Sequence, residues 1–224
     1  MKKIIGIINA LLVAAIFVGN YFYLTEGGLL LKGLCSGAFA LIGLVNLCYA
    51  LLKKEKDLRY PAAMAVGLVL AMLGDIFIGK NFVLGAGLFA LGHVCYVIAY
   101  CFMMELRRRD LIFGGVIFLG AACFILFAPV LSFSAVYMRW VCFVYALIIS
   151  MMVGKALSNV TREQTVVTIV LAVGSVLFFR SDLMLVFDWF TAAGSWTGKV
   201  CMATYYPAQC LLAVSSYLLL ARKK

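Results

Sequence analysis

Charged residues are scarce in this chain. Only 12% of its 224 residues are charged and 66% are hydrophobic, whereas about 25% of the residues in soluble domains are charged. The polar side chains cannot cover a water-facing globule, which excludes a soluble enzyme, a disordered chain and a coiled coil. With 3 prolines and 20 glycines, collagen-like or proline-rich extended material is excluded as well.

Motifs for several common site chemistries are also missing. No CxxC occurs, and the 8 cysteines fall within apolar runs, where a buried cysteine behaves as a small hydrophobe. The single histidine and the lack of HExxH argue against a catalytic zinc site, which normally takes three protein ligands. No GxSxG elbow supports Ser181 as a nucleophile. We therefore expect neither a metal nor another cofactor.

Long apolar runs fill the chain instead. At about 20 residues per crossing, its length allows eight or nine membrane helices and little else. The first run, from Ile4 to Leu24, is too long for the apolar region of a signal peptide. We predict an all-α, polytopic membrane protein with one membrane domain over 1–224. Its eight transmembrane helices are expected at approximately 4–24, 29–52, 61–79, 82–104, 111–128, 137–157, 166–187 and 200–220.

The basic residues predict the orientation of these helices. Lys and Arg collect in cytoplasmic loops, and most of the 19 basic residues fall on one side if both termini are cytoplasmic. The exceptions, which lie in or near the outer half of the membrane, are Lys32, Lys80, Arg139, Arg180 and Lys199. We therefore attribute the net charge of +10 to topology. No nucleic acid is expected as a partner, because the basic residues form no continuous face. We expect a multi-pass protein of a bacterial inner membrane.

Three ionisable side chains within the predicted spans point to a site. Asp75 lies in LGDIFIG, Asp182 in RSDLMLV and His93 in FALGHVCYVIAY. Such groups are expensive in a bilayer, so each one suggests a function. At 1.5 Å per residue, Asp75 lies about 6 Å, Asp182 about 8 Å and His93 about 17 Å from the outer ends of their helices.

Further polar residues are expected at a similar height. Lys32 lies about 5 Å from the outer end of its helix, and Tyr205 and Gln209 lie about 8 and 14 Å from theirs. His93 and Tyr96 share a face of the fourth helix. We expect a polar pocket between helices, open to the outer leaflet or to outer water.

Structural roles compete with this interpretation. Lys32 could snorkel to the interface, and Tyr205 and Tyr206 could belong to an interfacial aromatic belt. His93 could be an interhelical hydrogen-bonding group, and the expected role of Asn9, Asn20 and Asn46 is helix–helix contact. The two carboxylates are harder to explain in this way, because few cations lie at their depth. They favour acid–base chemistry in which one carboxyl donates a proton and the other stays ionised.

Several segments together resemble one family. They are LKG at 31–33, Gly74-Asp75, GLFALGHVCY at 87–96, YALIISMMVGKAL at 145–157, GSVLFFRSD at 174–182 and ATYYPAQCLL at 203–212. In order and spacing they are similar to the YhhN/TMEM86 family of lysoplasmalogenases. The resemblance implies eight membrane helices and hydrolysis of the vinyl ether bond of lysoplasmalogens to a fatty aldehyde and a glycerophospho-base.

The same resemblance implies a set of site residues. Asp75 and Asp182 would be catalytic, and the residues that would bind a lysophospholipid substrate are Lys32, His93, Tyr96, Tyr205 and Gln209. The expected partners are this substrate and the membrane lipids. Two alternatives remain open at the level of sequence. Asp75 and Asp182 could relay protons or bind a cation in a transporter or channel, or the chain could be a non-catalytic lipid-binding protein.

Overall fold

The computed structural model describes residues 1–222, and eight α-helices account for most of them. No strand occurs in this part of the chain. The helices are α1 (Lys2–Glu26), α2 (Leu29–Leu52), α3 (Arg59–Ile78), α4 (Phe82–Met103), α5 (Arg108–Phe127), α6 (Val136–Arg162), α7 (Val166–Phe190) and α8 (Trp196–Arg222). The prediction of an all-helical protein with eight helices is confirmed.

The helix ends follow local capping and burial. The side chain of Asn81 accepts a hydrogen bond from the backbone of Leu84 and begins α4, and Thr165 begins α7 in the same way. The largest difference from prediction is in α6, which was expected to end at 157 because polar residues follow. Ser158 and Asn159 are instead buried against neighbouring elements, so the helix continues to Arg162.

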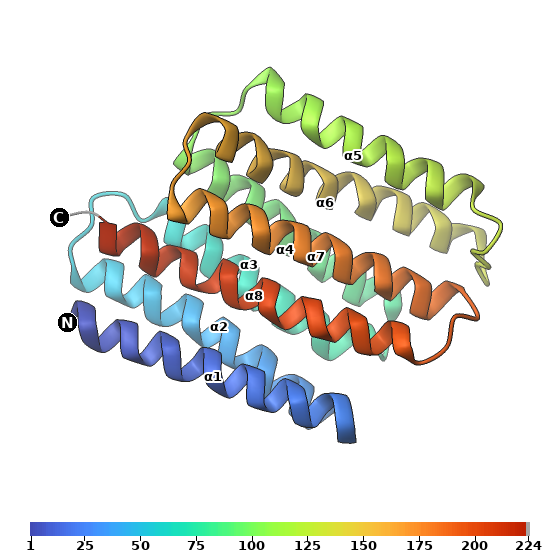
Figure 1. Ribbon diagram of the computed structural model, residues 1–224, viewed down its shortest axis with the longest axis horizontal. Helices are drawn as coiled ribbons and strands as arrows, with labels where there is room; N and C mark the ends of the chain where they lie inside the picture. Colours follow the sequence, from blue (N-terminus) through green and yellow to red (C-terminus); the bar gives the residue numbers. More distant parts are fainter. Residues whose placement is uncertain (223–224) are drawn as a thin grey trace.

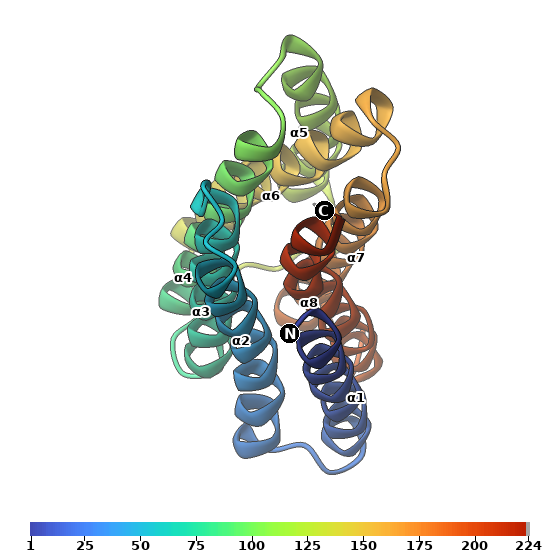
Figure 2. The same cartoon turned by 90° about the vertical axis from the view of Figure 1, so that its left-hand side faces the viewer.

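The helices form an elongated bundle. Viewed along its length, α2, α3 and α4 form one side, α1, α8 and α7 form the other, and α6 and α5 close one edge (Figure 2). Helix α8 packs against α1, α2, α3 and α7, whereas α5 packs closely against α6 alone among the described helices. Helix α1 begins and α8 ends at the same end of the bundle (Figure 1).

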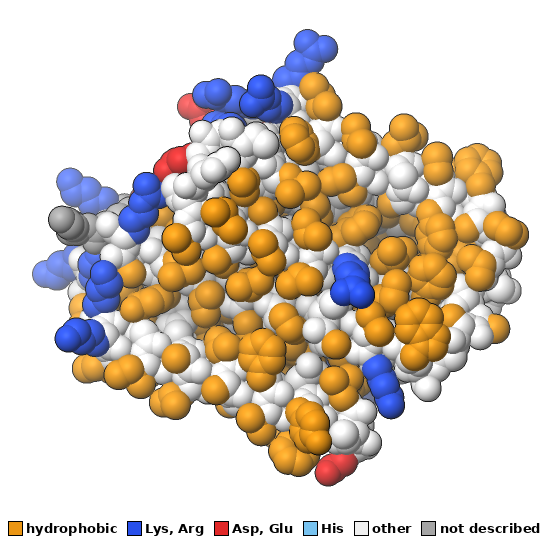
Figure 3. All heavy atoms as spheres, viewed as in Figure 1, with side chains coloured by type: hydrophobic (Ala, Val, Ile, Leu, Met, Phe, Trp, Pro, Cys, Tyr) orange, Lys and Arg blue, Asp and Glu red, His pale blue; other side chains and the backbone are white. Residues whose placement is uncertain are grey.

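Seven helices, α1 to α7, are long and apolar enough to cross a membrane. Helix α8 has 27 residues but is more polar, because it contains Thr197, Gln209, Ser215 and Ser216. These four side chains are buried in the bundle. On the face seen in Figure 3 hydrophobic side chains cover most of the bundle, and most of the Lys and Arg side chains gather at the end where α1 begins. The chain is therefore an integral membrane protein whose α8 has its polar residues in the protein interior.

Buried polar contacts also join other pairs of helices. Asn9 and Asn46 donate hydrogen bonds to each other at 2.9 Å, which confirms them as helix–helix contacts. Towards the end of the bundle where α6 ends, Lys155 is buried and its Nζ lies 2.7 Å from Asp110 Oδ2. Lys155 also donates to the backbone carbonyl of Glu105 at 2.8 Å. This buried pair fixes the start of α5 against α6.

Candidate active site

The first polar network surrounds Asp75, which is 2% exposed. Lys32 Nζ lies 3.3 Å from Asp75 Oδ1, and Tyr205 donates its hydroxyl proton to Oδ2 at 2.8 Å. Ser36 also donates to Oδ2. Lys32 and Ser36 are four residues apart on α2 and so lie on one face of that helix. The carboxyl of Asp75 therefore has a cation and two hydroxyl donors around it.

The network continues from Tyr205 along α8 to α4. Gln209, one turn after Tyr205, donates its amide to the Tyr205 hydroxyl at 3.1 Å. Tyr96 donates its own hydroxyl to Gln209 Oε1 at 3.2 Å. Tyr96 and Gln209 are 0% exposed. Four of the five predicted binding residues thus belong to the network around Asp75: Lys32, Tyr96, Tyr205 and Gln209.

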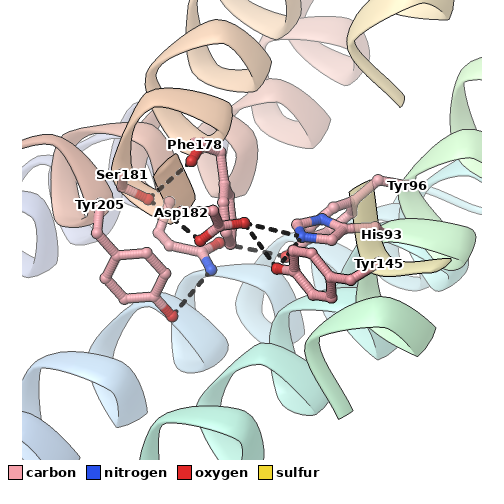
Figure 4. A network of polar contacts seen from close by, with 8 residues as sticks. His93, Tyr96, Tyr145, Phe178, Ser181, Asp182 and Tyr205 are labelled. Atoms are coloured by element: carbon pink, nitrogen blue, oxygen red, sulfur yellow. Dashed lines mark hydrogen bonds and ion pairs between the residues drawn. The ribbon is translucent and has the colours of Figure 1, made fainter. Parts of the chain in front are cut away.

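A second polar network surrounds Asp182 on α7 (Figure 4). Tyr145 of α6 donates its hydroxyl proton to Asp182 Oδ2 at 2.6 Å. His93 Nε2 lies 2.8 Å from the same hydroxyl and 3.5 Å from Asp182 Oδ2. Asp182 has no Lys or Arg partner among its contacts in the described chain and is 14% exposed. Its surroundings are thus less cationic and more open than those of Asp75.

Aromatic rings separate the two networks. The Phe178 ring lies edge-on between them, with ring centroids 4.6 Å from His93 and 5.2 Å from Tyr205. The Phe89 ring packs against the rings of Phe178 and Tyr205, with centroid separations of 6.4 and 6.0 Å. Gly74 allows this arrangement, because a Cβ there would come within 2.9 Å of the Phe89 ring. Within residues 1–222 no contact joins Asp75 directly to Asp182.

A cavity of about 400 Å³ lies beside the second network. Its walls come from α3 to α7 and are almost wholly apolar, and the lining residues include the polar side chains of Asp182 and Tyr145. Asp75 and Lys32 are not among its lining residues, whereas Phe89 is. A molecule in this cavity would meet the carboxyl of Asp182 directly and Asp75 only through intervening aromatic rings.

Residues that matter to this geometry were missed in the sequence. Tyr145 lies in the YALIISMMVGKAL segment, but a single tyrosine in a long apolar run gives no sign of its partner. Ser36 could have been found from its spacing of four residues after Lys32. In residues 1–222 no group of three or more His, Cys, Asp or Glu side chains is arranged to hold a metal ion.

Similarity to known proteins covers most of the chain. A model described as the YhhN family matches residues 35–216. Over 168 residues the chain is 29% identical to Lysoplasmalogenase TMEM86A of Bos taurus and 28% identical to Lysoplasmalogenase TMEM86A of Homo sapiens. Each alignment covers 71% of this chain and 68% of the relative. No solved structure matches the chain.

Proposed function

Because the chain belongs to the YhhN family, we propose that it hydrolyses the vinyl ether bond of a lysoplasmalogen within the membrane. The relatives named lysoplasmalogenase support a hydrolase at the level of the family. The observation that carries the proposal is the position of Asp182, whose carboxyl lies on the wall of an otherwise apolar cavity. Such a cavity suits a hydrocarbon chain and offers it one acid.

The proposed reaction begins with proton transfer to carbon. Protonated Asp182 gives its proton to the β-carbon of the vinyl ether, which leaves a cation at the α-carbon that is stabilised by the ether oxygen. The new carboxylate is stabilised by the hydrogen bond from Tyr145 and by the nearby His93. Water adds to the α-carbon and returns a proton to Asp182. The hemiacetal then collapses to a fatty aldehyde and the glycerol hydroxyl of the product.

We assign Asp75 a different task from Asp182. Paired with Lys32 and hydrogen-bonded by Tyr205, it stays ionised and fixes Tyr205. Tyr205 in turn packs against Phe89, which lines the cavity. Asp75 is therefore a positioning residue, as are the other members of its network, and His93 acts through Tyr145 and Asp182.

A comparison of three single-chain lipids tests the proposed reaction. A vinyl ether lysolipid should release aldehyde. The alkyl ether of equal chain length has no π bond to protonate, so it should inhibit without being cleaved. The ester should resist, because its hydrolysis needs a nucleophile and an oxyanion hole. The measurement is aldehyde and fatty acid release by purified protein in bilayers. Comparable cleavage of the ester would contradict acid-catalysed protonation and return Ser181 to consideration.

We also propose that α8 crosses the membrane with the other seven helices and that both termini are cytoplasmic. Cysteines introduced singly at Lys80 and Arg108 into a Cys-depleted chain test this topology, because both positions are exposed. A membrane-impermeant maleimide should label position 80 in intact cells and position 108 only after permeabilisation. Labelling of position 108 in intact cells would reverse the orientation.

A further inference from the structure

The cavity is not closed by close helix packing on the side between α5 and α7. Helix α5 and helix α7 both contribute to the cavity wall, yet α5 packs closely only against α6 within the described chain. Both helices are apolar and long enough to span a membrane. The space between them therefore lies at the depth of the bilayer rather than at a water-facing end.

The residues at this side of the cavity are small or lipid-facing. Gly120 of α5 lines the cavity, is exposed, and has no atom within 4 Å of the position of an added Cβ. Its neighbours Val116 and Leu119 are 68% and 65% exposed. One aromatic contact bridges the two helices, between the rings of Phe124 and Phe187, whose centroids lie 5.5 Å apart. Gly120 thus leaves open space between the cavity and the lipid-facing surface of α5. The contact between Phe124 and Phe187 lies at the edge of this space.

The lining determines which part of a lipid fits inside. It contains no Lys or Arg, and Asp182 is its one ionisable group besides Tyr145 and Cys142. An anionic or zwitterionic head group would lose its hydration there without gaining a cation. A hydrocarbon chain loses little, because the other lining side chains are as apolar as the acyl region of the bilayer. The occupant is therefore the chain of a membrane lipid, with the head group outside the cavity.

We propose that the space between α5 and α7 is a lateral opening through which one hydrocarbon chain of a membrane lipid enters the cavity from the bilayer. The chain passes beside Gly120 and brings the bond next to the head group towards Asp182. The identity of that bond rests on the proposed function, but binding of the chain does not require any reaction. The fatty aldehyde would leave by the same opening.

The test uses a non-hydrolysable alkyl ether lysolipid with a photoreactive group near the end of its chain, incorporated in vesicles with the purified protein. Irradiation followed by peptide mass spectrometry should place the label on cavity-lining residues of α5 and α7. Gly120→Phe should lower this labelling about tenfold or more, since overfilling a contact site readily removes more than 1.4 kcal/mol of binding free energy. The graded series Gly120→Ala, Gly120→Leu and Gly120→Phe should show progressive loss.

Gly115 provides a matched control on the same helix. A Cβ at Gly115 also has nothing within 4 Å, but this residue does not line the cavity. Gly115→Phe should leave the labelling unchanged. Equal labelling in wild type, Gly120→Phe and Gly115→Phe would overturn the lateral opening, as would label found only at the helix ends. Labelling that depends on Gly120 in a protein that releases no aldehyde would uphold the opening and reject the proposed function.

Discussion

Replacing Asp182 by asparagine is expected to lower the rate of vinyl ether hydrolysis by about 100-fold or more, the usual effect of losing a general acid. Asparagine has the size of aspartate and can accept the hydrogen bond from Tyr145, but it cannot give an acidic proton to carbon. Because Asp182 is not part of a buried ion pair with Lys or Arg in the described chain, the variant should insert and fold. Aldehyde release from a lysoplasmalogen in bilayers measures the effect.

Asp188 supplies the control for this substitution. It lies six residues further along α7 and accepts a hydrogen bond from Thr197 at 2.8 Å, and it does not line the cavity. Asp188→Asn should keep nearly wild-type activity.

Tyr145→Phe should give an intermediate loss of activity, because it removes one hydrogen-bond donor to Asp182 and leaves the acid in place. Near-normal turnover by Asp182→Asn would show that Asp182 is a structural hydrogen-bonding group.

The fold was largely predictable because a membrane imposes length and apolarity on every span. Breaks in the apolar pattern located all eight helices. Two features differ from the simple apolar pattern, the end of α6 and the polarity of α8. Both have the same cause, which is the burial of polar residues by neighbouring helices. Ser158 and Asn159 extend α6 beyond its predicted end, and Gln209 with Ser215 makes α8 too polar to qualify as a span on composition alone.

The depth of the candidate site in the membrane could largely be predicted from the sequence, but its division into two polar networks could not. Depth along a helix follows from the rise per residue, and Lys32, which was expected at nearly the level of Asp75, does contact it. His93 was expected well below the level of Asp182, yet the two side chains lie 3.5 Å apart. Depth does not determine which helices face each other across the bundle. Phe178 and Phe89 lie at the same level as the polar residues and separate them into two networks. A single two-carboxylate pocket was the simplest expectation, and only helix packing could have divided it.

Substitutions of Lys32 and Asp75 can distinguish the contribution of the first network to stability from any contribution to hydrolysis. Lys32→Met should lower the free energy of unfolding by about 3–5 kcal/mol, the usual cost of leaving one charge of a buried pair without its partner. Asp75 is the more buried of the two, at 2% exposed against 12% for Lys32. Asp75→Asn should therefore cost less, because the longer Lys32 side chain can reach the interface. Unfolding in mixed detergent micelles measures each free energy.

The double variant Lys32→Met/Asp75→Asn decides the role of Asp75. With both charges removed, and with Ser36 and Tyr205 still able to donate to the asparagine carbonyl, most of the lost stability should return. Because we propose that Asp75 acts only by fixing Tyr205, the double variant should also retain measurable hydrolysis. The exposed pair Arg222 and Glu163, at 59% and 51% exposed, is the control, and Glu163→Gln should change the free energy of unfolding by less than about 1 kcal/mol. A double variant that is fully stable but inactive would mean that Asp75 takes part in the chemistry itself, through a rearrangement of Phe89 and Phe178 that admits it to the cavity.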